Sequence, residues 1–250
     1  TFTNNPNGLS HYYGNAIIEN CTFNNNGGWP AAQYFYYGDL TIANCSFDNS
    51  LESGLSLYEG TASFENCSFN NNVGWGAGPN SSTATINYCS FDNNQGGGLS
   101  SNMDSFLTAS NSSFDNNYKG FSIGGESNCS IINCSISNNQ SAGVSISSSD
   151  GVFENCTINY NSPGATIHNT TDSAPLSPLF NNCTFIGNNW EWGGGAVNIT
   201  NMDPIFKNTL FQSNVATGSG GAMYITNSNT TLDSCKFYFN SAPDYGGTIM

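Results

Sequence analysis

The amino-acid sequence predicts an all-β fold in which the chain winds into a solenoid of about ten short coils. One six-residue phrase recurs along the chain: an apolar residue, any residue, Asn, Cys, Ser or Thr, then Phe or Ile, as in residues 42–47 and 153–158. Its fourth position falls every 22 to 27 residues, at Cys21, Cys45, Cys67, Cys89, Ser112, Cys134, Cys156, Cys183, Thr209 and Cys235. Repeats built from helices need about 33 residues or more, so this interval fits a coil of short strands.

Each coil is predicted to hold three short strands joined by tight turns. Side chains alternate between the two faces of a strand, so the Cys position and the Phe two residues later point inward together. The Asn before the Cys position marks a corner, because Asn tolerates the left-handed backbone that a corner needs. A second row of Asn, five residues after the Cys position, is interpreted as a second corner: Asn26, Asn72, Asn94, Asn117, Asn139, Asn161, Asn188, Asn214 and Asn240.

Stacked coils place equivalent residues above one another, about 4.8 Å apart. Because parallel crossovers are overwhelmingly right-handed, the predicted fold is a right-handed, single-stranded parallel β-helix. The chain starts and stops in mid-coil, at residues 1–5 and 246–250, and solenoid ends need caps to stay soluble. We therefore expect residues 1–250 to be a single β-helix segment, uncapped at both ends, of a longer repeat array. Its expected partners are itself or neighbouring repeats, end to end or side by side.

The composition excludes several classes of partner. The formal net charge is −14, with three Lys and no Arg, so nothing in the chain could neutralise a run of nucleic-acid phosphates. The same charge argues against binding an anionic membrane. Apolar runs near 18 residues are absent from the sequence, so we expect no insertion into a membrane.

The coil resembles the right-handed parallel β-helix repeat of the pectate-lyase-like superfamily along essentially the whole chain. The last three coils resemble more narrowly the repeats of chlamydial polymorphic outer-membrane proteins, whose signatures are Phe-x-x-Asn and Gly-Gly-Ala-Ile. The matching residues are 185–188 with 194–197, 211–214 with 220–223, and 237–240 with 246–249. The resemblance implies the fold but leaves the function open, because this coil serves lyases, hydrolases, adhesins and fibres.

The nine cysteines are interpreted mainly as a column of free thiols. A Cys-x-x-Cys pair is absent from the sequence, which argues against a zinc site. Ser112 and Thr209 occupy the same slot, so the slot favours a small side chain, and buried unpaired Cys behaves as a small hydrophobe. Disulfides between some adjacent coils are the alternative. Cys129 lies off the column and is interpreted as a surface thiol or as the partner of a cysteine outside this segment.

Thirteen Asn-x-Ser/Thr sequons predict N-glycosylation of an extracellular protein. Five are expected in a variable turn along one edge of the rod and are the favoured sites: Asn80, Asn128, Asn169, Asn198 and Asn229. The other eight rank lower, because their Asn already has a corner role: Asn20, Asn44, Asn66, Asn111, Asn133, Asn139, Asn155 and Asn182.

Candidate catalytic residues are sparse, and we expect no catalytic site, no cofactor and no metal. β-Helix lyases use a basic residue with acid-bound calcium, and this chain offers only Lys119 with Asp115 nearby. His11 and His168 belong to distant coils. Asp48, Asp92 and Asp115 recur at one turn position, where turns favour Asp anyway, so Ca²⁺ binding is a minor alternative.

Each coil is also predicted to hold a short apolar strand that begins at a Gly, here called the Gly strand, as in residues 98–99 and 120–123. Large aromatic residues precede the Gly strand in several coils. They form a candidate contact strip for sugar rings or a neighbouring molecule: Trp29, Trp75, Tyr118, Trp190, Trp192 and Tyr245. Trp and Tyr are enriched at interfaces, although the same residues could simply cover the open side of the turn.

These observations favour a non-catalytic structural repeat protein outside the cell. We expect a secreted or surface-displayed glycoprotein that forms a segment of a stalk, fibre or adhesin. A carbohydrate-binding adhesin module is the first alternative, drawn from the aromatic strip. A polysaccharide lyase or hydrolase is the second alternative, drawn from the fold alone.

Overall fold

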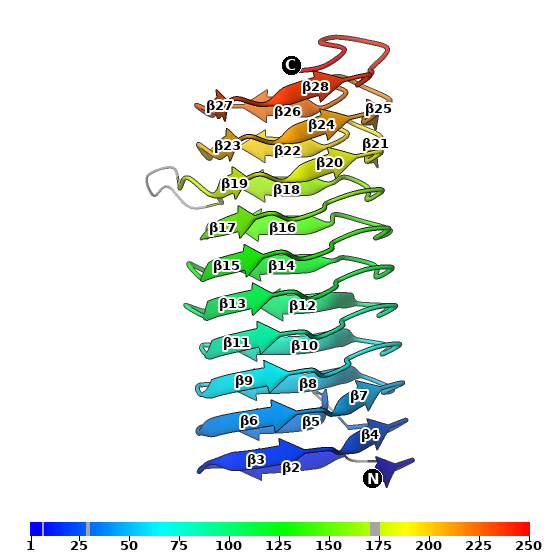
Figure 1. The fold of residues 1–250 in the computed structure, drawn as a ribbon, viewed down its shortest axis with the longest axis vertical. Helices are drawn as coiled ribbons and strands as arrows, with labels where there is room; N and C mark the ends of the chain where they lie inside the picture. The colour runs from blue at the N-terminus through cyan, green and yellow to red at the C-terminus, as the bar shows by residue number, and fades with distance from the viewer. Residues whose placement is uncertain (7, 29–30, 171–175) are drawn as a thin grey trace.

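The computed structural model describes residues 1–6, 8–28, 31–170 and 176–250, and it confirms the solenoid. Figure 1 shows the coils stacked in chain order from the N-terminus to the C-terminus. Every regular element in the described residues is a β-strand. Each strand pairs in parallel with the equivalent strand of a neighbouring coil, as Thr83–Asn87 does with Thr61–Glu65. None of the described segments is a helix long and apolar enough to cross a membrane.

Two ten-stranded parallel sheets form two faces of each coil. Sheet 1 contains β2 (Leu9–Tyr12), β5 (Ala31–Tyr36), β8 (Ser53–Tyr58), β10 (Trp75–Asn80), β12 (Gly97–Ser101), β14 (Phe121–Gly124), β16 (Val144–Ser147), β18 (Ala165–His168), β22 (Val197–Thr200) and β26 (Met223–Thr226). Sheet 2 contains β3 (Ala16–Glu19), β6 (Asp39–Ala43), β9 (Thr61–Glu65), β11 (Thr83–Asn87), β13 (Phe106–Ser110), β15 (Asn128–Ile132), β17 (Asp150–Glu154), β19 (Leu179–Asn181), β23 (Ile205–Lys207) and β27 (Thr231–Asp233).

The Cys and Phe positions form the third face. Near the N-terminus it holds β1 (Phe2–Thr3), β4 (Thr22–Asn24) and β7 (Ser46–Asp48), and near the C-terminus β20 (Thr184–Ile186), β24 (Leu210–Gln212) and β28 (Lys236–Tyr238). Single bridges continue the pairing between them, from Ser46 with Ser68 to Thr157 with Thr184. β21 (Asn189–Trp190) and β25 (Val215–Ala216) form a short extra pair in the turn that follows.

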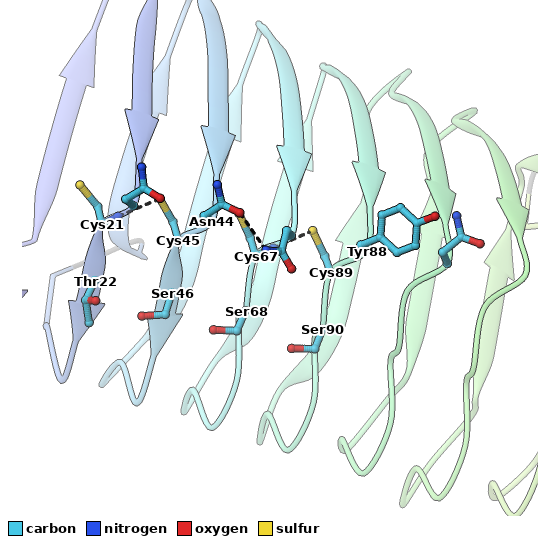
Figure 2. Close-up of a pocket in the computed structure, with 13 residues that line it drawn as sticks. Cys21, Thr22, Asn44, Cys45, Ser46, Cys67, Ser68, Tyr88, Cys89 and Ser90 are labelled. Atoms are coloured by element: carbon cyan, nitrogen blue, oxygen red, sulfur yellow. Dashed lines mark hydrogen bonds between the residues drawn. The ribbon is translucent and has the colours of Figure 1, made fainter.

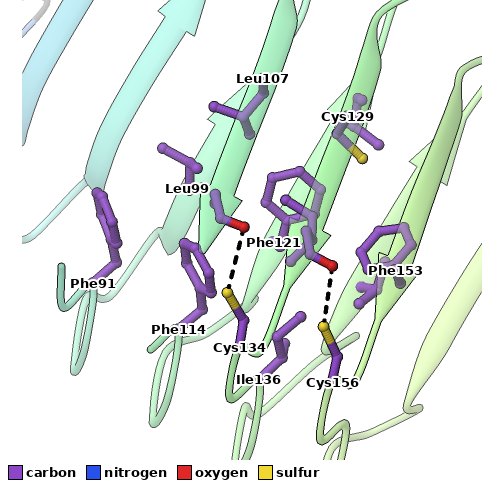
Figure 3. Packing of buried hydrophobic residues seen from close by; sticks show 14 of the residues in the cluster. Phe91, Leu99, Leu107, Phe114, Phe121, Cys129, Cys134, Ile136, Phe153 and Cys156 are labelled. Carbon is purple, nitrogen blue, oxygen red and sulfur yellow. Dashed lines mark hydrogen bonds between the residues drawn. The ribbon is translucent and has the colours of Figure 1, made fainter. Parts of the chain in front are cut away.

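Stacked side chains fill the interior, as the repeat predicted. The rings of Phe2, Phe23, Phe47, Phe69, Phe91 and Phe114 lie parallel, with neighbouring centroids 4.7–5.2 Å apart. Ile136 and Ile158 continue this row at full burial, and Phe185, Phe211 and Phe237 complete it. Figure 3 shows part of this packing, in which Phe91 and Phe114 lie in successive coils and the buried Cys134 lies in the coil after Phe114. Burial of apolar area and the ring stacking together hold each coil on the next.

The corner before the Cys position also forms as predicted. Its residues have left-handed backbone angles, with φ of 54° at Asn20, 53° at Asn66 and 54° at Asn155. Tyr88 takes the same conformation in the one described coil that places a Tyr there, with φ of 51°. Asn is the residue that reaches this region at the lowest steric cost after Gly, which explains why it dominates the row.

The predicted second corner is wrong by one residue. The left-handed residue is the one before the predicted Asn, as at Asn71 (φ 58°) and Asn138 (φ 58°). The predicted Asn instead points inward and is buried, as at Asn72 and Asn139. There its amide satisfies backbone groups that the turn leaves without strand partners, a role that needs both a donor and an acceptor.

Candidate functional site

An open groove of about 640 Å³ runs along the corner between sheet 2 and the third face. Three rows line it: the corner Asn, the Cys column and the Ser or Thr that follows (Figure 2). The coils of Asn20, Asn44 and Asn66 place sequons along the groove, and Tyr88 replaces the corner Asn in the following coil. The left-handed corner turns the Asn side chain outward, while the Cys that follows it enters the core. Asn66 donates its amide to the oxygen of Asn44 at 2.8 Å, and Asn155 donates to Asn133 at 3.1 Å.

The exposure of the sequon Asn side chains in the structure does not follow the order in which the sequence favoured them as glycosylation sites. All seven corner Asn are exposed, from Asn20 to Asn182. Of the favoured five, Asn128 and Asn229 are exposed, whereas Asn169 is 6 % exposed and its oxygen accepts a bond from Ser148. Asn139 is 2 % exposed. Glycosylation itself stays a prediction, but a buried amide cannot meet a glycosylating enzyme in the folded protein.

The expected position of the favoured sequons needs a correction. Asn80 and Asn198 are half-buried residues of β10 and β22, and Asn128 begins β15, so these three lie in strands and not in a variable turn. The strands extend further than predicted because the turn between sheet 1 and sheet 2 is tight in most coils. β10 ends at Asn80 and β11 begins at Thr83.

All nine cysteines are free in the structure. The thiols in the column donate to main-chain carbonyl groups, as Cys156 does to Ile131 and to Glu154 at 3.3 Å each. Burial is the main cause that raises the pKa of the Cys134 thiol to about 12. A buried protonated thiol is a small apolar side chain, which agrees with the Ser and Thr found in the same slot.

Cys129 is not a surface thiol, which corrects the prediction. It is 2 % exposed and occupies an inward position of β15, between Leu107 and Gly151 in the neighbouring strands. A Cβ on Gly151 would come within 2.4 Å of the Cys129 sulfur, so the thiol fills the space that this glycine leaves. Strand alternation from Ile131, two residues later, could have identified this slot as internal.

The acidic residues at the turn bond to the next coil. The carboxylate of Asp115 accepts hydrogen bonds from the Ser135 hydroxyl at 2.8 Å and from the Ser137 main-chain amide at 2.6 Å. The carboxylate of Asp92 likewise accepts a hydrogen bond from the Ser113 hydroxyl. Burial raises the pKa of both carboxyl groups. Groups of three or more His, Cys, Asp or Glu suited to a metal are absent from the described residues.

The other residues considered for catalysis lie apart. His11 is in β2, where its Nε2 atom lies 3.1 Å from the carbonyl oxygen of Gly14. His168 is in β18, and burial, with a contribution from Lys119, lowers its pKa. The two histidines therefore lie seven strands apart in sheet 1 and cannot act together.

The predicted aromatic strip divides into covering and projecting residues. Trp75 is half-buried, and its ring lies so close to Gly97 of the next coil that a Cβ there would meet it at 2.4 Å. Trp190 is also half-buried, in β21, whereas Trp192 is 77 % and Tyr245 is 72 % exposed. Tyr118 is exposed in a different coil, and Trp29 lies outside the described residues. No described ring contact joins members of the strip.

Sequence reasoning missed a cluster of tyrosines on the outer face of sheet 1. Six of the twelve tyrosines lie within the first three strands of that sheet or directly after them: Tyr12, Tyr13, Tyr34, Tyr36, Tyr37 and Tyr58. Two signals in the sequence could have found them: the alternating tyrosines in residues 34–37 and the tyrosine pair at 12–13. Both lie outside the segment before the Gly strand that holds the predicted contact strip.

Comparison with known proteins identifies the class. The profile of the right handed beta helix region matches residues 1–99 and 78–211, and the chain belongs to this family. A search of curated proteins finds no match.

Solved structures show the same fold at low sequence identity. The catalytic domain of a GH87 α-1,3-glucanase in complex with nigerose is 13 % identical, with a TM-score of 0.54 over 95 % of this chain and 58 % of that one. The tailspike protein gp49 of Pseudomonas phage LKA1 is 14 % identical (TM-score 0.52, 97 % of this chain and 50 % of the tailspike). PfbA, a surface adhesin of Streptococcus pneumoniae, is 9 % identical (TM-score 0.51, 92 % and 72 %). The chain thus spans less than two thirds of the glucanase domain.

Proposed function

We propose that this chain is a non-catalytic structural segment of an extracellular protein, a stalk, fibre or cell-surface adhesin that carries N-glycans. Its task is to hold a fixed length and direction outside the cell. A surface adhesin and a phage tailspike with the same fold support this role, as does the scarcity of charged residues, which make up 8 % of the chain.

The observation that carries the proposal is the continuity of bonding between coils. Within the buried Asn row, Asn94 accepts the amide N–H of Asn72 at 2.9 Å, Asn117 accepts that of Asn94 at 2.7 Å, and the same contact continues to Asn240. Each of these side chains also donates to a carbonyl of the preceding coil, as Asn94 does to Phe69. Such a ladder resists both bending and separation of the coils, because each bond crosses from one coil to the next.

Electron microscopy and turnover assays test the proposal together. The purified chain should appear as straight rods about 50 Å long, from ten coils at strand spacing. Immunogold labelling of intact cells should decorate the surface. Incubation with α-1,3-glucan or polygalacturonate should release no new reducing ends. Turnover of either polymer by the purified chain would overturn the non-catalytic role, and labelling confined to the cell interior would overturn the location.

A further inference from the structure

The six tyrosines named above, here called the tyrosine surface, form one connected group of rings on the outside of sheet 1. Tyr12, Tyr36 and Tyr58 occupy the same register position in three successive strands. Their ring centroids are 6.3 Å apart at each step. Tyr34 lies between this row and the strand beginnings, 5.8 Å from both Tyr12 and Tyr58.

A second pair extends the surface toward the turn. Tyr13 and Tyr37 stack with centroids 5.3 Å apart and an angle of 8° between their planes. Tyr37 also meets Tyr36 edge to face at 4.3 Å. The rings therefore support one another, which limits the rotamer freedom that each would lose on binding a ligand.

The fold itself does not require these rings. The strands that continue the row place Asn80, Asn102, Gly124 and Ser147 at the equivalent position, all of them small or polar. Tyr12 is nevertheless 59 % exposed and Tyr13 is 69 % exposed. A gathering of exposed aromatic side chains at one end of an otherwise polar face indicates a contact surface for another molecule.

The turns beside the tyrosine surface add hydrogen-bonding groups. An open hollow of about 580 Å³ is bounded by Tyr37, Asp39, Glu59, Thr61 and Asp104, together with glycine, serine and threonine of the same turns. A hydrogen bond to Glu59 is the main cause that raises the pKa of the Tyr37 hydroxyl. The hollow thus presents carboxylates and hydroxyls, while the three lysines of the chain lie elsewhere.

We propose that the tyrosine surface and its adjoining hollow bind a neutral polysaccharide. The C–H faces of sugar rings pack on aromatic rings, and carboxylates and phenol hydroxyls bond to sugar hydroxyls. The row of rings repeats with the coils, so it suits a polymer that also repeats. The carboxylates and the net charge of −14 disfavour an acidic polymer. This inference concerns a ligand and stands whether or not the chain is a structural rod.

Affinity electrophoresis through gels that contain soluble β-glucan, α-glucan, mannan or polygalacturonate tests the proposal. The unmodified chain should be retarded by at least one neutral polymer and not by polygalacturonate. A variant with Tyr12, Tyr36 and Tyr58 replaced by Asn copies the residue of the next two coils and should keep the fold, as checked by circular dichroism. It should bind at least about tenfold more weakly, a change of about 1.4 kcal/mol.

The matched control replaces three exposed aromatic residues that belong neither to the tyrosine surface nor to the predicted contact strip, Tyr160, Tyr238 and Phe239, with Asn. It should be retarded as strongly as the unmodified chain. Retardation by none of the neutral polymers would overturn the proposal, as would retardation by polygalacturonate alone. Equal weakening in the two triple variants would also overturn it, because binding would then not depend on the tyrosine surface. Sedimentation of the free chain as a dimer that the first variant dissociates would assign the surface to self-association instead.

Discussion

Replacing Asn139 with Ala removes one member of the buried amide row. Its Oδ1 atom accepts the amide N–H of Asn117 at 2.8 Å, and its Nδ2 atom donates to the carbonyl of Phe114 at 3.1 Å. Ala leaves both main-chain groups without these partners inside the solenoid. An orphaned buried group costs about 1–3 kcal/mol, so we expect the two together to cost about 2–6 kcal/mol. That is a large share of the stability of an ordinary domain, about 5–15 kcal/mol.

Urea unfolding followed by circular dichroism measures this loss as a lower midpoint at an unchanged slope. Gln140→Ala is the matched control, because Gln140 is the exposed neighbour, and its midpoint should stay within about 0.5 kcal/mol of the unmodified chain. Hydrogen exchange should place the opening in the coils next to residue 139, since solenoid coils contact only their neighbours. An Asn139→Ala midpoint as close to the unmodified value as that of the control would refute the reasoning.

Three further predictions concern the core and the corner. Gln33→Leu should stabilise the chain by about 1–3 kcal/mol in urea unfolding, because both polar atoms of this buried side-chain amide lack hydrogen-bond partners. Leu9 and Leu55 flank Gln33 in the neighbouring strands, so a leucine there meets apolar side chains. A lower unfolding midpoint for the variant would contradict this prediction. Cys134→Ser should change stability by less than about 1 kcal/mol, as Ser112 fills the same slot. Burial raises the pKa of the Cys134 thiol to about 12, so the stability that the protonated thiol contributes is complete below about pH 8.5 and is lost as the pH rises toward 12. Urea unfolding of both chains at a series of pH values measures this loss. If the stability of Cys134→Ser and of the unmodified chain falls equally above pH 8.5, the predicted role of the Cys134 thiol is wrong. Glycopeptide mapping after secretion from a glycosylating host should find glycans at corner sequons such as Asn44 and none at Asn139; glycan at Asn139 would show that transfer precedes folding.

The repeat alone was enough to predict the architecture. A phrase whose Cys and Phe positions recur at one interval leaves few folds available, and the Phe rows stack as that interval requires. The left-handed corner at residues such as Asn44 also followed from a local preference of Asn. Both predictions succeed because strand alternation and backbone sterics act within a few residues and need no knowledge of the rest of the molecule.

Features that depend on neighbouring coils could not be predicted in the same way. Asn138 forms the left-handed turn and Asn139 is buried, although the two residues are identical in type. Only the position of the next coil decides which of the two side chains enters the core. Cys129 faces inward by alternation with Ile131, but the space for its sulfur depends on Gly151 in the next strand. The tyrosine surface arises from residues that lie more than twenty positions apart in sequence, at Tyr12, Tyr36 and Tyr58, and meet only through strand register.

The in-register pairing of each strand with its counterpart one coil away has a consequence for how such a chain can vary. Removing the 22 residues from Ser113 to Cys134 would join Ser112 to Ser135, and every remaining ladder would close on an equivalent residue. Duplication of the same stretch would lengthen the molecule by one step without disturbing its neighbours. The length of the solenoid can therefore change by insertion or deletion of whole coils in the gene, without altering the ligand contacts that any other coil makes.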